Sequence, residues 1–338
     1  MRKGLRAVVT GGAGFIGSHL VDRLLRDGHR VTVLDDLSTG RARNLAHHAG
    51  DPNLHVVRAD VTDLRRIAGP IRASDWVFHL AALADIVPSI ERPTDYFQAN
   101  VVGTQRVLEA ARGAKGLKRL VYAASSSCYG FPDAVPTPET AAIRPQYPYA
   151  LTKRLGEELV LHWGKVYGMP VVSTRFFNVF GPRSRTSGTY GAVFGVFLAQ
   201  KINGKPFTVV GDGKQTRDFT FVTDVADALV RAAASDAAVG EVFNVGSGGT
   251  HSVNRLVELL GGPVARLPKR PGEPDCTFAD ISKIRRTLGW RPKVSFEEGV
   301  GRMLERLDDW REAPVWTPKS IGRATKTWFR HLSAAQAA

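Results

Sequence analysis

The 338-residue sequence contains only two cysteines, Cys128 and Cys276, so it has neither a disulfide framework nor enough thiolates for a cysteine-based zinc site. Neither a histidine pair spaced around a glutamate nor an acidic calcium loop occurs, and no metal site is expected. No apolar run approaches the roughly 20 residues of a membrane-spanning helix, and no apolar signal-peptide core follows the N-terminus. These absences predict a soluble, cytoplasmic protein.

Acidic residues are also comparatively scarce: the chain has 32 Asp and Glu against 46 Lys and Arg, which gives a formal net charge of +14. Such an excess is compatible with nucleic acid, a phosphate-bearing ligand, an anionic membrane surface, or a solvated basic surface without a partner. No basic patch interleaved with base-stacking aromatics stands out, so we do not expect nucleic acid. Hydrophobic residues make up 43% of the chain and charged residues 23%, as in globular proteins.

The first half of the chain alternates strand-like runs with helix-length segments, which predicts an α/β fold with a doubly wound parallel sheet. After about residue 176 the pattern loosens into short elements between glycine- and proline-rich turns, which predicts a smaller C-terminal α/β domain. We expect one domain at 1–175 with a returning segment near 219–247, a second mainly at 176–310, and a basic tail at 311–338. The expected strands are 5–10, 30–34, 54–57, 76–80, 120–124 and 171–174, and the expected helices include 16–26, 94–112 and 149–167.

A glycine-rich loop, with Gly11, Gly14 and Gly17, directly follows the first expected strand and opens the first expected helix. Glycines at this place permit a tight turn and close approach of a pyrophosphate to the helix N-terminus. Asp35 follows about 20 residues later, at the end of the second strand, where a carboxylate accepts from a ribose 2′-hydroxyl and repels a 2′-phosphate. The pattern predicts NAD rather than NADP.

Tyr149 and Lys153 lie four residues apart, on one face of an expected helix. A phenol with a pKa of about 10 is a poor base at neutral pH, and a neighbouring ammonium in a dry pocket lowers that pKa. Ser125, Ser126 and Ser127 follow another strand, at the sheet edge where such folds bind ligands. Hydroxyl groups there suit a sugar hydroxyl or ketone.

Together these residues resemble the extended short-chain dehydrogenase/reductases, in particular the NAD-dependent nucleotide-sugar epimerase/dehydratase branch. The resemblance covers roughly residues 5–307 and leaves the tail outside. The segments that match this family are the glycine loop, 35–40, 79–82, Asn100, the serine loop, Tyr149 with Lys153, 175–183, 211–219 and 270–273.

The resemblance implies a tightly bound NAD that takes a hydride from sugar C4 and returns it to the other face of a 4-keto sugar. Ser125, Tyr149 and Lys153 are the implied catalytic residues: Tyr149 removes the 4-hydroxyl proton, Lys153 lowers the Tyr149 pKa and holds the nicotinamide ribose, and Ser125 shares the proton. The expected cofactor-binding residues are Gly11, Gly14, Phe15, Ile16, Gly17, Asp35, Asp36, Ser38, Gly40, Asp60, Val61, Leu80, Ala81, Ala82, Asn100, Ala123, Tyr149, Lys153 and Phe176.

Two positions separate reaction types within the resemblance. Related dehydratases carry an Asp–Glu pair where this chain has Ser126 and Ser127, so no acid is expected there to protonate a leaving hydroxyl. Epimerisation of a UDP-sugar is therefore favoured over dehydration. The expected substrate-binding residues are Ser125, Ser126, Ser127, Asn178, Ala192, Val193, Arg217, Arg270, Glu273 and Thr277.

The sugar itself is left open. In hexose 4-epimerases a bulky tyrosine at the position of Thr277 excludes N-acetyl groups, so Thr277 predicts that N-acetylhexosamines are accepted beside plain hexoses. Arg185 is placed to hold a uronate carboxylate, but glucuronate epimerases carry threonine where this chain has Asn178. A UDP-glucuronate 4-epimerase or decarboxylase therefore ranks second, and an NAD-binding regulatory protein is the non-enzyme alternative.

The resemblance further implies a homodimer joined through the helices at 94–112 and 149–167. In the tail, Ile321, Trp328, Phe329 and Leu332 roughly share one helical face beside basic residues. Such a face binds weakly to an anionic membrane surface or, as the favoured interpretation, packs on its own domain.

Overall fold

The computed structural model describes residues 4–184 and 193–335. The strands are β1 (Arg6–Thr10), β2 (Arg30–Asp35), β3 (Leu54–Arg58), β4 (Trp76–His79), β5 (Arg119–Ser125), β6 (Val171–Phe176), β7 (Asn178–Phe180), β8 (Phe207–Val210), β9 (Thr216–Arg217), β10 (Phe219–Phe221), β11 (Val242–Val245), β12 (His251–Ser252) and β13 (Val264–Leu267). The α-helices are α1 (Phe15–Arg26), α2 (Leu64–Arg72), α3 (Ile86–Glu91), α4 (Pro93–Phe97), α5 (Gly103–Arg112), α6 (Pro148–Tyr167), α7 (Val193–Ile202), α8 (Val222–Ala234), α9 (Val253–Leu260), α10 (Ser282–Leu288), α11 (Phe296–Leu304), α12 (Pro318–Ala324) and α13 (Lys326–Ala335). Short helices of other types are η1 (Ala42–His48), η2 (Gln98–Val102), η3 (Ser126–Tyr129), η4 (Asp236–Ala238) and η5 (Leu307–Trp310).

Seven parallel strands form one sheet in the order β11-β6-β5-β4-β1-β2-β3. All six strands expected from the sequence are present, and each ends within two residues of its expected bounds. Helices α1 and α8 pack together on one face of this sheet, and α2, α5 and α6 pack on the other. The predicted doubly wound α/β fold is confirmed.

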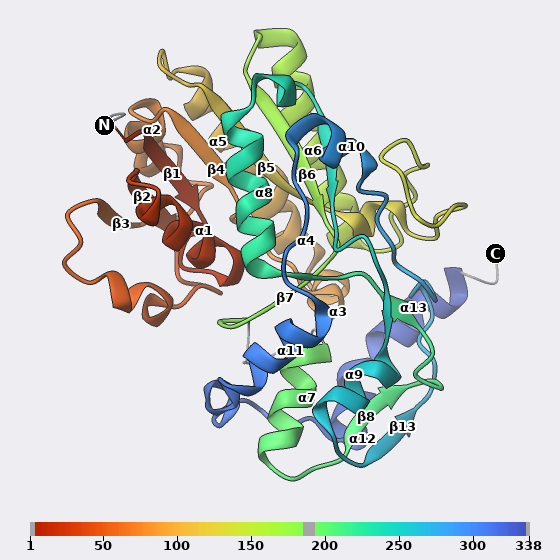
Figure 1. The fold of residues 1–338 in the computed structure, drawn as a ribbon. Coiled ribbons are helices and arrows are strands. Elements are labelled where there is room, and N and C mark those ends of the chain that lie inside the picture. Colours follow the sequence, from red (N-terminus) through yellow and green to blue (C-terminus); the bar gives the residue numbers. More distant parts are fainter. Residues whose placement is uncertain (1–3, 185–192, 336–338) are drawn as a thin grey trace.

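The second half of the chain contributes to both ends of the molecule (Figure 1). Strand β11 pairs with β6 at the edge of the large sheet, and α8 lies against α1. Helices α7, α9 and α12 gather with β8 and β13 around a separate core that includes Phe197, Phe207 and Trp310. A site between the two cores is therefore lined by segments far apart in the sequence.

We expected one regular helix over 94–112, and the structure corrects this. Three consecutive helical segments of two kinds cover the range. Helices α4 and α5 flank η2, whose turns are the wider π type. A π segment inserts an extra residue into a helix and is frequent at functional sites. Asn100, an expected site residue, lies within it.

The tail beyond 311 is folded rather than frayed. Ile321, Trp328 and Leu332 are buried, and Phe329 is half-buried. The apolar face that the sequence offers to a membrane is thus mostly covered by the protein itself, which agrees with the packing interpretation. No helix in the described ranges 4–184 and 193–335 has the length and apolar character to span a bilayer.

Candidate active site

The strand order places a crevice between the carboxyl ends of β1 and β4. The chain runs outward from β1 through β2 to β3, then returns to the other side of β1 with β4. Ligands of open α/β sheets bind at such a reversal point. Gly11, with φ +70°, lies so close to the loop after β4 that an added Cβ would be 2.8 Å from the Ala81 amide nitrogen. Only glycine allows the two loops to meet here.

A buried histidine connects these loops to η2. His79 Nδ1 lies 2.7 Å from Thr10 Oγ1, and His79 Nε2 lies 3.0 Å from Thr104 Oγ1. Thr104 donates its proton to the Asn100 carbonyl at 2.6 Å, so its oxygen accepts from Nε2 and the ring is neutral. Burial lowers the His79 pKa to about 3, which keeps the ring neutral. Thr10 Oγ1 accepts from the amides of residues 80–81, which fixes the loop after β4.

Asn100 holds two further segments with its side chain. Its Oδ1 accepts from the Leu83 amide at 2.8 Å, and its Nδ2 donates to the Leu83 carbonyl and to Thr152 Oγ1, each at 3.0 Å. Thr152 lies in α6 between Tyr149 and Lys153. Asn100 therefore positions α6 against the loop after β4.

The glycine loop and Asp35 form the cradle expected for NAD. A Cβ on Gly17 would overlap the Gly11 carbonyl oxygen, and a Cβ on Gly40 would lie 2.7 Å from Asp35 Oδ1. Asp35 ends β2 and accepts from the Ala13 amide at 2.9 Å and the Leu37 amide at 2.8 Å. Burial raises the pKa of the Asp35 carboxyl.

These contacts keep the Asp35 carboxylate beside the glycine turn, where each oxygen retains a lone pair for a ribose hydroxyl. The backbone of the glycine turn lies at the start of α1, whose N-terminus favours a phosphate. The residues therefore fit an NAD molecule that is held through its ribose and pyrophosphate.

The other expected cofactor residues lie on or beside several elements from α1 to β6. Phe15 and Ile16 form the first turn of α1, and Leu80, Ala81 and Ala82 follow β4. Asp36 caps the next turn by accepting from the Ser38 amide and hydroxyl, and Asp60 accepts from the Thr62 amide. Three apolar members of the set are buried: Val61, Ala123 and Phe176.

Ser125, Tyr149 and Lys153 come together at the carboxyl end of β5. Ser125 is the last residue of β5, and its Oγ lies 2.8 Å from Ser127 Oγ. Tyr149 is the second residue of α6 and is hydrogen-bonded to Ser125. Burial raises the pKa of the Tyr149 phenol, and the hydrogen bond with Ser125 opposes that shift. With its pKa raised by burial, the Tyr149 phenol keeps its proton in the protein alone.

Lys153 is buried one turn after Tyr149. Burial lowers the pKa of its ammonium group to about 7, and the Glu157 carboxylate opposes this effect. The Lys153 Nζ lies 4.4 Å from the centre of the Tyr122 ring, on the face that attracts cations. Burial thus disfavours the charge of Lys153, and Glu157 and the Tyr122 ring offset this effect only in part.

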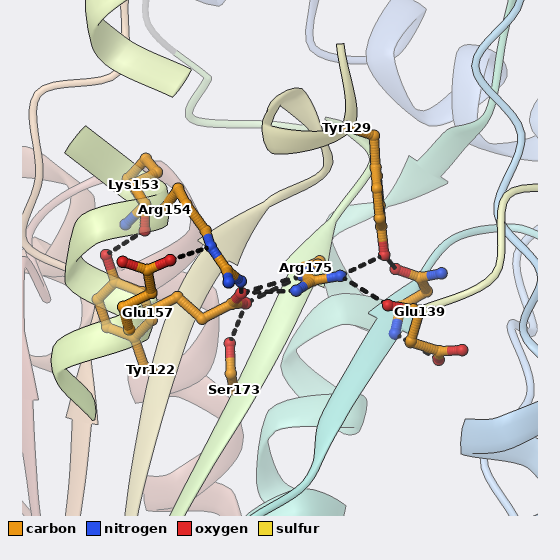
Figure 2. Close-up of polar contacts among 10 residues, drawn as sticks. Tyr122, Tyr129, Glu139, Lys153, Arg154, Glu157, Ser173 and Arg175 are labelled. Atoms are coloured by element: carbon orange, nitrogen blue, oxygen red, sulfur yellow. Dashed lines mark hydrogen bonds and ion pairs between the residues drawn. The ribbon is translucent and has the colours of Figure 1, made fainter. Parts of the chain in front are cut away.

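A charge network that sequence reasoning missed lies below Lys153 (Figure 2). Glu157 accepts from Arg175 Nη2 at 2.7 Å, from Arg154 Nη1 at 2.8 Å and from Ser173 Oγ at 2.8 Å. Burial raises the pKa of Glu157, but the hydrogen bonds from Arg175 and Ser173 and the charges of Arg175 and Arg154 together outweigh it, and the net shift is downward. The only sequence signal was a glutamate four residues after Lys153, where the two side chains share a helix face.

Arg175 extends this network to η3 and to the neighbouring strand β11 (Figure 2). Its Nη1 donates to Tyr129 Oη at 2.8 Å and to the Glu139 carbonyl at 3.1 Å. Tyr129 in turn donates to Asn244 Oδ1 at 2.7 Å, in β11. A buried ion pair with all its polar groups bonded fixes the position of α6 on the sheet.

Expected substrate residues gather on the opposite side of the crevice. Arg270 Nη1 donates to Glu273 Oε1 at 3.3 Å, and Arg217 Nη2 lies 3.9 Å from Glu273 Oε2. The three side chains line a pocket of about 330 Å³ together with Lys214 and Lys269. Two arginines on one carboxylate leave positive charge for an anionic ligand, and their forked geometry suits a diphosphate.

Asn178 and Thr277 meet beside that pocket. The Thr277 hydroxyl donates to Asn178 Oδ1 at 2.8 Å and accepts from the Asp218 amide at 3.3 Å. Ser126 and Ser127 lie in η3, and Val193 begins α7. Ala192 and Arg185, also expected at the substrate site, fall outside the described residues.

Cys128 and a cluster around Asp22 carry groups that could be reactive or bind a metal. Cys128 is buried, which raises the pKa of its thiol to about 12 and makes it a poor nucleophile. Asp22 accepts from His47 Nε2 and His48 Nε2, each at 2.8 Å, and from Arg183 at 2.8 Å. Because a guanidinium already neutralises this carboxylate, we assign no metal to it.

Comparison with known proteins agrees with this geometry. The model of the "NAD dependent epimerase/dehydratase family" matches residues 7–246. A UDP-glucose 4-epimerase of Mycolicibacterium smegmatis is 39% identical over 310 residues, which are 89% of this chain and 98% of that protein. UDP-glucuronic acid decarboxylase 2 of Arabidopsis thaliana is 36% identical over 98% of this chain and 74% of its own length.

Two solved structures are similar over 90% of this chain and 99% of theirs, each with a TM-score of 0.83. One, at 35% identity, is a UDP-N-acetylglucosamine 4-epimerase from Methanobrevibacter ruminantium in complex with UDP-N-acetylmuramic acid. The other, at 31% identity, is a UDP-glucuronic acid 4-epimerase from Bacillus cereus in complex with UDP-glucuronic acid and NAD. The family match, these relatives and the NAD cradle at Gly11–Gly17 and Asp35 lead to one conclusion: the chain belongs to the NAD-dependent epimerase/dehydratase family, and its cofactor is NAD.

Proposed function

We propose that the chain catalyses the NAD-dependent 4-epimerisation of a UDP-sugar, a UDP-hexose or a UDP-N-acetylhexosamine. The observation that carries this proposal is the set of Ser125, Tyr149 and Lys153 at the carboxyl end of β5, next to β4 in the sheet, together with the arginine pocket. Bound NAD supplies hydride transfer from sugar C4 and back to it.

The side chains supply proton transfer and position. Tyr149 removes the proton of the sugar 4-hydroxyl, which requires its phenol pKa to fall from the value that burial imposes. Charged Lys153, one turn later on α6, lowers it by favouring the phenolate. Ser125 is bonded to Tyr149 and shares the proton, which returns to the sugar when the second face is reduced.

We assign the nucleotide diphosphate to the pocket of Arg217, Arg270 and Glu273, and the sugar to the space between Thr277 and Tyr149. In this assignment Asn178 contacts a phosphate and Glu273 contacts the uridine ribose. Val193 lies beside the nucleobase. This division places NAD on 1–175 with the returning segment 219–247, and the UDP-sugar mainly on 176–310. Ser126 and Ser127 offer hydroxyls but no acid, which supports epimerisation over dehydration.

The proposal includes a homodimer. Apolar side chains are exposed on α4 and α6, among them Phe97 (46%), Leu151 (46%), Val166 (53%) and Tyr167 (48%). Exposed apolar groups on neighbouring helices suit a second copy of the chain. Light scattering that gave a monomer at micromolar concentration would contradict this part.

Tyr149→Phe tests the chemistry, because it removes the proton acceptor and keeps the ring. We expect its turnover of UDP-glucose or UDP-N-acetylglucosamine to fall by about a thousandfold, in the range for loss of general base catalysis. Turnover within threefold of the unchanged protein would overturn the mechanism. Conversion of UDP-glucuronate to a pentose nucleotide would instead identify a decarboxylase, the activity named for the Arabidopsis relative.

A further inference from the structure

The tail helix α13 touches the segment that carries Arg270. Trp328 in α13 is only 3% exposed, and its Nε1 donates to the Pro271 carbonyl at 2.7 Å. Arg270 Cζ lies 5.6 Å from the centre of the Trp328 ring, within the distance of a cation–π contact. One side chain therefore contacts both the backbone and the cation of this segment.

The same helix also packs on the next residue of the segment. Gly272 has φ +76°, and an added Cβ would lie 3.1 Å from Leu332 Cδ1. Leu332 is 8% exposed and belongs to the same face of α13 as Trp328. Residues 270–272 thus lie against α13 along two of its turns.

The same face of α13 also packs against α3, near the proposed catalytic tyrosine. Val87, Trp328 and Leu332 form one buried cluster, and Tyr147 packs against it. The Tyr147 ring is nearly parallel to the Tyr149 ring, with centres 6.4 Å apart. The tail therefore bridges the arginine pocket and the start of α6. These tail residues lie beyond the 7–246 range matched by the family model.

The surroundings of Arg270 disfavour the charged form of its guanidinium, so a contact that holds the side chain in place matters here. Arg270 is 11% exposed at its side chain, and burial lowers its pKa. Its carboxylate partner Glu273 is shared with Arg217. A long side chain that is held in its binding rotamer before the ligand arrives loses less entropy on binding.

We propose that Trp328 is a positioning residue for Arg270, so that the C-terminal helix sets the affinity of the site for a nucleoside diphosphate. The inference rests on the proposed function, because it takes Arg270 as a diphosphate ligand. It assigns to the tail a part in substrate binding and none in NAD binding.

The test measures UDP and NAD affinities of the full-length protein by calorimetry, with UDP as the probe. Trp328→Leu removes the ring and its N–H; Trp328→Phe keeps a ring and loses the N–H. We expect the UDP dissociation constant to rise by about tenfold in the first and about threefold in the second, with NAD affinity unchanged. The KM for the sugar nucleotide should rise in parallel, with kcat within twofold.

Phe329→Ala is the matched control, because Phe329 is the neighbouring aromatic on α13 and is half-buried. It should leave UDP affinity within twofold. An unchanged UDP affinity in Trp328→Leu would overturn the inference, as would parallel losses of UDP and NAD affinity, which indicate general unfolding.

Arg270→Ala separates this inference from the proposed function. If Arg270→Ala weakens UDP binding, the diphosphate assignment holds, and the Trp328→Leu effect should then disappear in the double variant. A full Trp328→Leu effect in the Arg270→Ala background would overturn the positioning role. If Arg270→Ala leaves UDP affinity unchanged, both the assignment and the inference fail.

Discussion

The ammonium nitrogen of Lys153 lies 4.4 Å from the centre of the Tyr122 ring. The Tyr122 hydroxyl donates to the Lys153 carbonyl at 3.3 Å, so the same tyrosine holds the backbone of Lys153 and faces its charge. Burial nevertheless lowers the Lys153 pKa to about 7. The protein therefore keeps, beside its proposed base, a cation that the folded state tolerates poorly.

Lys153→Met should abolish a pH dependence of stability. Folded Lys153 loses its proton near pH 7, whereas the unfolded lysine keeps it up to about pH 10.5. Between these values the unfolded chain binds more protons, so the free energy of unfolding of the natural protein rises with pH, by at most about 1.4 kcal/mol per unit. Urea unfolding from pH 7 to 9.5 measures this slope. Tyr149→Phe is the control that keeps it, and a slope that survives in Lys153→Met would contradict the assignment.

Glu157→Gln should destabilise the fold, because Arg175 would be left as a buried cation without its ion pair. The expected loss is about 3–5 kcal/mol in the free energy of unfolding. Glu158→Gln, on the exposed neighbour that pairs with Arg154, should cost less than about 1 kcal/mol. Equal losses in the two variants would contradict a structural role for the buried pair.

The Glu157–Arg175 pair also predicts that the free energy of unfolding decreases at acidic pH. Because the folded pKa of Glu157 is lowered, its stabilising effect is complete above the unfolded value of 4.5 and is lost as the pH falls through the folded pKa. The difference in unfolding free energy between the natural protein and Glu157→Gln should therefore shrink below pH 4.5. A difference that stays constant down to pH 3 would oppose the assigned shift.

Thr277→Tyr should change the choice of sugar. A tyrosine ring fills the space that we assign to an N-acetyl group, so turnover of UDP-N-acetylglucosamine should fall by at least about a hundredfold while UDP-glucose is spared. Thr277→Val serves as the control, because it keeps the size and removes the hydroxyl that donates to Asn178. If neither or both of the substrates were lost in Thr277→Tyr, the steric explanation would fail.

Asp35→Asn should weaken the preference for NAD over NADP. The substitution keeps the size of the side chain and removes the charge that repels a 2′-phosphate. We expect the ratio of NAD to NADP affinity to fall by about tenfold, measured by fluorescence titration of nucleotide-free protein. An unchanged ratio would mean that Asp35 only accepts hydrogen bonds from the Ala13 and Leu37 amides and does not select the cofactor.

The local patterns of the sequence predicted the elements and the cofactor crevice well. The run from Gly11 to Gly17 places a turn between a strand and a helix, and alternation of strands and helices fixes a parallel sheet. Both signals are short-range, because they depend on spacing and periodicity within one segment. The strands are accordingly correct to within two residues.

Contacts between distant segments were not predictable in this way. Glu157 and Arg175 lie on different elements, and nothing in their spacing marks them as partners. The apolar face of the tail was recognised, but its periodicity does not reveal that Trp328 would meet Pro271. The π segment at Asn100 was also missed, because helical periodicity predicts a regular α-helix over 94–112.

The most direct test of the proposed epimerase is proton NMR of the purified protein, without added cofactor, on UDP-glucose deuterated at C4. UDP-N-acetylglucosamine and UDP-glucuronate are assayed beside it. We predict that the 4-epimer accumulates to equilibrium with deuterium retained at C4, because the same hydride returns to the sugar. Epimer that has lost the label to solvent, or no epimer of any of the three, even with NAD supplied, would contradict the proposed reaction.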